Sequence, residues 1–117
     1  VDFGVLLSEV QSSIERMATD MKAIEAPKGA DLDRLKDRLE SVQKDALARL
    51  CASGPRVQQR YGLQGMASLF SPLSSAERKL NRGWAALVDR HWPEALSSIE
   101  GAAADLSEAQ SALGELT

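Results

Sequence analysis

The sequence predicts an all-α protein, an up-and-down four-helix bundle, and three observations indicate this fold. Apolar residues recur in steps of three and four along most of the chain, which places them on one face of a helix. Aromatic residues make up only 4% of the chain, so the core must consist mostly of Leu, Val, Ile, Met and Ala, which suit helices better than sheets. Short segments rich in Pro, Gly and Ser separate the apolar stripes.

The expected helices span about residues 3–25, 32–52, 75–91 and 93–115, with a partly helical connector at 56–72. Two helical hairpins with short turns, joined by a longer connector, are typical of an up-and-down bundle. A chain of 117 residues corresponds to one domain by the usual size of domains, so we expect 1–117 to form a single helical-bundle domain.

The first helix is predicted by an unbroken apolar stripe, which Pro27 brings to an end. Proline lacks a backbone donor and disfavours a helical residue before it, so the helix should stop ahead of this position. The members of the stripe are Leu7, Val10, Ile14, Met17, Met21 and Ile24.

A second stripe of the same period predicts the second helix. Asp31 is the expected N-cap, because a short acidic side chain can accept a hydrogen bond from the first turn. The tripeptide SGP at residues 53–55 should stop this helix. The members of the stripe are Leu32, Leu35, Leu39, Val42, Ala46 and Leu50.

The connector, RVQQRYGLQGMASLFSP, contains two glycines that interrupt the helical period. We expect one or two short helical turns that cover an end or a side of the bundle, because a structureless loop of this length is unusual inside a small domain. It nevertheless carries several large apolar residues, more than a simple link requires, namely Val57, Tyr61, Leu63, Met66, Leu69 and Phe70.

The third and fourth helices are expected to form a tight hairpin. The motif SSAE at residues 74–77 fits a capping box, so the third helix should begin at Ser74 or Ser75. Gly83 lies inside that helix, and close approach of a neighbouring helix would compensate for its low helix propensity. Pro93 suits the first turn of a helix and disfavours helical geometry before it, so the chain should break and reverse at 91–92.

The charge of the chain is unevenly distributed along its length. The net charge is −3, yet residues 44–90 carry eight bases against three acids, and residues 91–117 carry five acids and no base. We expect the acidic segments to neutralise part of the basic one, because its bases are spread over several elements without interleaved aromatic residues. We therefore expect no nucleic-acid partner, and anion or nucleic-acid binding through 44–90 stays open as an alternative.

The sequence contains few residues suited to catalysis or metal binding. One cysteine, Cys51, excludes an internal disulfide and a multi-cysteine metal site, and we expect it to be a half-buried structural thiol. No phosphate-binding loop, zinc spacing, nucleophile elbow or Glu-x-x-His motif occurs. We therefore expect no enzyme, no catalytic or metal-binding residues and no cofactor.

The single histidine and the two tryptophans lie close together in the sequence. We expect His91 at a helix C-terminus, where its positive charge is favourable, Trp84 in the core and Trp92 as a plug at the end of the bundle. An alternative is a small-ligand or haem-binding sensor or carrier. In a haem-binding bundle Met21 and His91, at the same end, would be the two axial ligands.

The function that the sequence favours is a non-catalytic helical interaction or scaffold domain that binds a protein partner or self-associates. The expected contact residues are the apolar residues of the connector together with one tryptophan: Tyr61, Leu63, Met66, Leu69, Phe70 and Trp92.

Apolar runs of only a few residues, against the ~20 needed to cross a bilayer, predict no membrane insertion of this segment. The chain starts at Val1 rather than methionine, so we expect a mature product or a domain of a longer protein. We favour the cytoplasm slightly, and the composition also permits the periplasm or another extracytoplasmic compartment.

Overall fold

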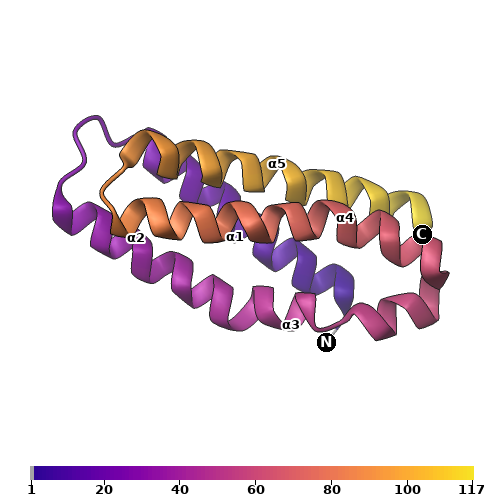
Figure 1. Ribbon diagram of the computed structural model, residues 1–117. Helices are drawn as coiled ribbons and strands as arrows, with labels where there is room; N and C mark the ends of the chain where they lie inside the picture. The colour runs from indigo at the N-terminus through magenta and orange to yellow at the C-terminus, as the bar shows by residue number, and fades with distance from the viewer. Residues whose placement is uncertain (1) are drawn as a thin grey trace.

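The computed structural model describes residues 2–117 and consists of helices joined by short turns (Figure 1). The predicted all-α four-helix bundle is confirmed, and no strand occurs in the described residues. The molecule measures 46 × 21 × 19 Å. The elements are α1 (Phe3–Lys22), α2 (Gly29–Val42), a five-residue π-helix (Gln43–Leu47), α3 (Ala48–Cys51), α4 (Gly54–Val88) and α5 (Trp92–Leu116).

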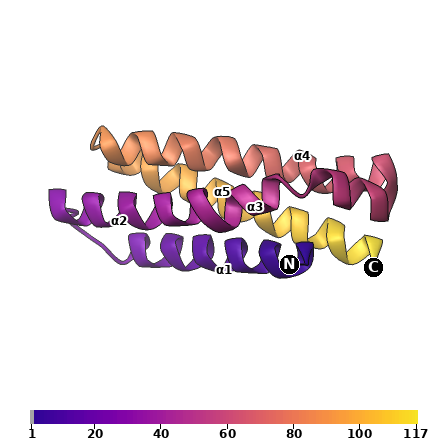
Figure 2. The ribbon, with the colours of Figure 1, turned by 90° about the horizontal axis from the view of Figure 1, so that it is seen from below.

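The four long elements α1, α2, α4 and α5 pack side by side around a shared core. The antiparallel pair α4 and α5 forms the most extensive packing, α1 packs on α5, and α2 packs on α4. Figure 2 shows α1 and α4 on opposite sides of the molecule, with α2 and α5 between them. The start of α1 also packs against the π-helix and α3, which continue α2 toward the same end.

The first hairpin differs slightly from its predicted boundaries. Helix α1 ends at Lys22, and α2 begins at Gly29, three residues before the expected start at 32. The prediction of Asp31 as N-cap was wrong, because its carboxylate reaches back from the first turn and accepts the Lys28 N–H at 2.9 Å. This backbone hydrogen bond, followed by one from Arg34, lowers the pKa of the Asp31 carboxyl.

The prediction that the third helix begins at Ser74 or Ser75 was also wrong. Helix α4 runs from Gly54 to Val88, with non-helical backbone only at Gly62, and it passes through Pro72. A proline inside a helix costs about 3 kcal/mol or more. Burial of Leu69 and Leu73, both 0% exposed, offsets this cost, because each buried leucine contributes roughly 1.5–3 kcal/mol.

The reversal between α4 and α5 is confirmed and has a defined geometry. The His91 N–H donates to Ala86 O at 2.8 Å and the Arg90 N–H donates to Leu87 O at 3.3 Å, the pattern of a Schellman cap. Arg90 takes the left-handed conformation that this cap requires, with φ 62°. Its guanidinium donates to Gly29 O at 3.1 Å and to Asp33 Oδ1 at 3.0 Å, which ties the turn to the start of α2.

The core lies along the common axis and is built from the predicted stripes. Gly83 allows the expected close approach, since a Cβ at this position would lie 3.1 Å from Ile99 Cδ1 of α5. Within residues 2–117, no helix has a stretch long and apolar enough to cross a bilayer. The largest side chains that are fully buried are Leu7, Ile14, Met17, Met21, Leu39, Leu50, Leu69, Leu73, Leu80, Leu87, Ile99 and Leu106.

Candidate partner-binding surface

The break at Gly62 shapes one end of the molecule. Its φ of 78° and ψ of 175° lie in a region of backbone space that is essentially restricted to glycine. The chain therefore turns sharply between a short helical segment, 54–61, and the long segment 63–88. Figure 1 shows this turn at the end of the molecule where the C-terminus also lies, and we name it the Gly62 end.

The sequence-predicted contact residues of the connector have different environments. Leu63 follows the break directly, and its side chain is 66% exposed. Tyr61 and Met66 are half-buried. Leu69 is 0% exposed, so its prediction as a contact residue was wrong: helix α4 turns it into the interior. The ring of Phe70 is half-buried and packs on Phe3 of α1, with the two ring centroids 6.0 Å apart.

One residue of this surface was missed from the sequence. Leu116, in the last turn of α5, is 36% exposed, and its methyl carbons lie 3.5–3.6 Å from the position that a Cβ of Gly65 would occupy. The end of α5 thus lies in ordinary van der Waals reach of α4 at Gly65, and a Cβ there would be excluded by Tyr61 Cβ, 2.6 Å away across the Gly62 break. No local signal in the sequence links residue 116 to residue 65. We name the exposed and half-buried residues Tyr61, Leu63, Met66 and Leu116 the apolar tip.

Trp92 does not belong to this surface. It occupies the first turn of α5, at the opposite end of the molecule from the Gly62 break (Figure 1). The intervening helical segment, 63–88, is roughly 39 Å long at the usual rise per residue. Trp92 is half-buried against the core, and so is Trp84, whose Nε1–H donates to Glu40 Oε1 at 2.8 Å.

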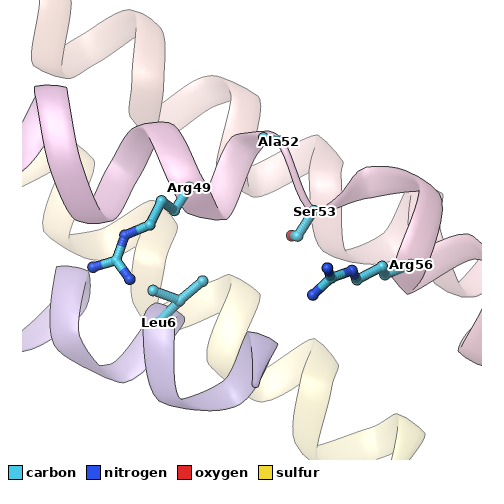
Figure 3. Close-up of a pocket in the computed structure, with 5 residues that line it drawn as sticks. All are labelled: Leu6, Arg49, Ala52, Ser53 and Arg56. Carbon is cyan, nitrogen blue, oxygen red and sulfur yellow. The ribbon is translucent and has the colours of Figure 1, made fainter. Parts of the chain in front are cut away.

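A hollow of about 270 Å³ lies between the start of α1 and the α3–α4 turn. Figure 3 shows Leu6 of α1 facing the turn, with the guanidinium groups of Arg49 and Arg56 to either side of it in this view. Ala52 and Ser53 complete the lining. The hollow therefore combines an apolar floor with cationic walls.

A second hollow of about 150 Å³ adjoins the first and shares Ser53 and Arg56 with it. This second hollow extends toward the apolar tip, because Tyr61 lines the hollow and is also a member of the tip. We name the two together the arginine hollow. The second part is lined by Asp2, Phe3, Ser53, Arg56, Val57, Arg60 and Tyr61.

The arginines of this hollow differ in their electrostatic partners. Arg49 Nε lies 3.2 Å from Asp45 Oδ1, so this arginine already has an anionic partner, in an exposed ion pair. No carboxylate oxygen of residues 2–117 lies within 4.0 Å of a nitrogen of Arg56 or Arg60. The guanidinium carbon of Arg60 instead lies 5.4 Å from the centre of the Tyr61 ring, a cation–π arrangement. Arg56 and Arg60 are thus exposed cations that can pair with an external anion.

Cys51 is half-buried, as predicted, and its position does not favour nucleophilic chemistry. Its Sγ lies 3.4 Å from Glu77 Oε2. Burial first, and then the negative charge and hydrogen bond of Glu77, raise the pKa of the thiol to about 12. The reactive species of a cysteine is the thiolate, so this thiol is weakly reactive near neutral pH. The nearby arginines, which could have lowered the pKa, do not determine it.

His91 and Met21 do not face a common space. The structure places His91 in the turn just before α5, where it is exposed and its Nδ1 lies 4.0 Å from Glu94 Oε2. Helix α4 ends at Val88, so the expectation that the third helix includes His91 at its C-terminus was wrong: His91 lies just beyond α4, in its cap, and is also the N-cap residue of α5. Met21 is 0% exposed within the core. A pair of axial haem ligands would have to line one cavity, so this arrangement does not support the haem alternative.

The described part of the chain, residues 2–117, has no group of three or more His, Cys, Asp or Glu side chains that could hold a metal ion. Comparisons of the chain with protein-family models, with curated proteins and with solved structures give no match. The arginine hollow and the apolar tip are therefore interpreted from their own geometry.

Proposed function

We propose that this chain is a non-catalytic helical interaction domain that binds a segment of a protein partner at the Gly62 end. The observation that carries the proposal is the 66% exposure of Leu63, held outward by the break and flanked by the half-buried apolar residues of the tip. Apolar side chains gathered at one place on the surface favour a partner site, whereas an exposed apolar residue that stands alone, such as Val88, needs no partner. The adjoining hollow supplies the depth that a flat surface lacks.

The size of this end favours a partner segment over a second copy of the chain. The molecule measures 21 × 19 Å across, which gives a cross-section of about 400 Å². Two copies joined end to end would bury about 800 Å² in total, whereas stable specific interfaces bury roughly 1,200–2,000 Å². A short segment that lies across the tip and enters the hollow contacts both surfaces without needing a wide flat interface.

The proposal is tested by selecting short random peptides on the immobilised protein and measuring the affinity of the enriched peptides by fluorescence anisotropy. We expect Leu63→Asp to weaken binding by at least about tenfold, since a charge at the centre of an apolar contact leaves the partner's apolar group unpaired. Val88→Asp is the matched control, because Val88 is 44% exposed at the other end of the same helix.

Both variants should keep the circular dichroism spectrum of the wild type, since both positions are exposed. The proposal is overturned if no peptide is enriched, or if the enriched peptides bind the Leu63→Asp variant as well as the wild type. A loss of affinity that is equal in the Leu63→Asp and Val88→Asp variants also contradicts it, because it places the contact elsewhere.

A further inference from the structure

We infer that the arginine hollow recognises acidic side chains, so that the domain selects partner segments in which Asp or Glu stands next to a large apolar residue. This inference rests on the proposed function and names the chemistry of its partner. It depends on the pairing of two exposed arginines with an apolar floor at one place in the fold.

The cationic part of the site consists of Arg56 and Arg60. They are four residues apart in the helical segment 54–61 and therefore lie on the same face. Both line the hollow, and no carboxylate of residues 2–117 lies within 4.0 Å of either guanidinium. A guanidinium group binds a carboxylate through two parallel hydrogen bonds, which provides orientation as well as attraction.

The acids near the hollow limit how many carboxylates it can accept. Asp45 already forms an ion pair with Arg49, so this arginine adds little attraction for a carboxylate of the partner. Asp2 stands on the opposite wall, where its carboxylate accepts the Val5 N–H at 3.3 Å and caps α1. Its negative charge disfavours a carboxylate on that side. The acidic side chain of a partner should therefore lie on the α4 side, between Arg56 and Arg60.

The apolar part of the site positions the neighbouring residue of the partner. Leu6 and Val57 are 4% and 3% exposed and form the floor, while the half-buried rings of Phe3 and Tyr61 form the wall toward the apolar tip. The larger part of the hollow, about 270 Å³, is slightly smaller than the usual pockets for drug-sized ligands, roughly 300–1,000 Å³. Its size fits one or two side chains of a peptide.

A peptide fits the charge distribution better than a nucleic acid does. Nucleic-acid binding relies on many phosphate contacts, but only two unpaired arginines line this hollow. Helix α5, whose end lies beside the tip, carries no base, so an extended phosphate backbone would find no further cationic partner there. The other two exposed arginines of α4, Arg78 and Arg82, lie more than four turns along the helix from Arg60.

The test uses the peptides enriched in the selection above and compares two double variants of equal charge change. Arg56→Gln/Arg60→Gln removes the proposed cations, and Arg78→Gln/Arg82→Gln removes the second i,i+4 arginine pair of α4, which is also exposed. We expect the enriched peptides to contain Asp or Glu next to a large apolar residue. We expect their affinity to fall at least about tenfold in the first variant and less than about twofold in the second.

Raising the NaCl concentration from about 50 to about 300 mM should weaken binding to the wild type several-fold and change binding to Arg56→Gln/Arg60→Gln much less. The inference is overturned if the enriched peptides lack acids or bind Arg56→Gln/Arg60→Gln like the wild type. If peptides that lack acids, or that bind Arg56→Gln/Arg60→Gln like the wild type, still lose affinity in the Leu63→Asp variant, the proposed function stands and only the inference is overturned. An oligothymidylate that displaces the peptides in an Arg56- and Arg60-dependent manner overturns it in favour of a nucleic acid.

Discussion

Truncating Leu69 to alanine is expected to lower the free energy of unfolding by about 2–5 kcal/mol, whereas the same truncation at Leu63 should change it by less than about 0.5 kcal/mol. The two leucines are six residues apart in the same helix. Leu69 is 0% exposed and Leu63 is 66% exposed. The alanine variant of Leu69 leaves a cavity in the interior, while the alanine variant of Leu63 removes a side chain that water already surrounds.

Urea denaturation followed by circular dichroism measures both variants on the same scale. Equal effects of the Leu69 and Leu63 truncations would contradict the orientation of α4 described here, because a flexible connector would leave both side chains similarly solvated. The Leu63 variant should also have the m-value of the wild type, since removing an exposed side chain changes little of the surface area that unfolding exposes.

Replacing Gly62 with alanine is expected to lower the free energy of unfolding by about 1–3 kcal/mol, entirely through the backbone. A Cβ at this position would meet nothing within 4 Å, so crowding contributes nothing to the cost. The penalty arises because φ of 78° with ψ of 175° is strained for any residue with a side chain. The strain is local, so we expect the same helical content after the replacement.

Gly114 provides a matched control, for which replacement by alanine should change the free energy of unfolding in the opposite direction. It also has open space at its Cβ position, but it lies within the helical backbone of α5. Gly114→Ala should therefore raise the free energy of unfolding by up to about 1 kcal/mol, because alanine is the better helix former. If alanine is tolerated equally at both positions, the backbone at residue 62 does not have the geometry that creates the Gly62 end.

The spacing of apolar residues was sufficient to predict the bundle. Leu7, Val10, Ile14, Met17 and Met21 of the first stripe are all 0–1% exposed. Steps of three and four keep such residues on one face of a helix, whatever the partner helix turns out to be. The reversal before Pro93 could be predicted for a similar reason, since the effect of proline on its preceding residue is local.

Helix boundaries that depend on tertiary packing could not be predicted in this way. The glycines at 62 and 65 suggested an irregular connector, yet only Gly62 interrupts the helix, which also passes through Pro72. Burial of the neighbouring leucines decides the outcome, and this burial requires the position of α5. The π-helix at 43–47 is a second case: it places both Ala46 and Leu47 in the core, whereas the regular stripe predicted only the first.

The candidate site was only partly predictable from the sequence, because the sequence does not reveal which charged side chains form ion pairs in the folded protein. Residues 44–90 contain eight bases, and the expectation that acids neutralise some of them agrees with the ion pairs in the structure. Those ion pairs join Lys44 to Glu40, Arg49 to Asp45, Lys79 to Asp105 and Arg90 to Asp33. Of the remaining four arginines, only Arg56 and Arg60 line the hollow, and this follows from the position of α1.

The central claim is that α4 has a single break, at Gly62, and that this break holds Leu63 and the arginine hollow at one end of the bundle. Backbone NMR chemical shifts and amide exchange rates across residues 54–88 test it most directly. We expect helical Cα shifts on both sides of residue 62 and slow exchange for the amides of residues 67–71 and 73–75. Coil shifts and rapid exchange from residue 63 to residue 74 would contradict it, because the hollow and the tip would then have no fixed geometry.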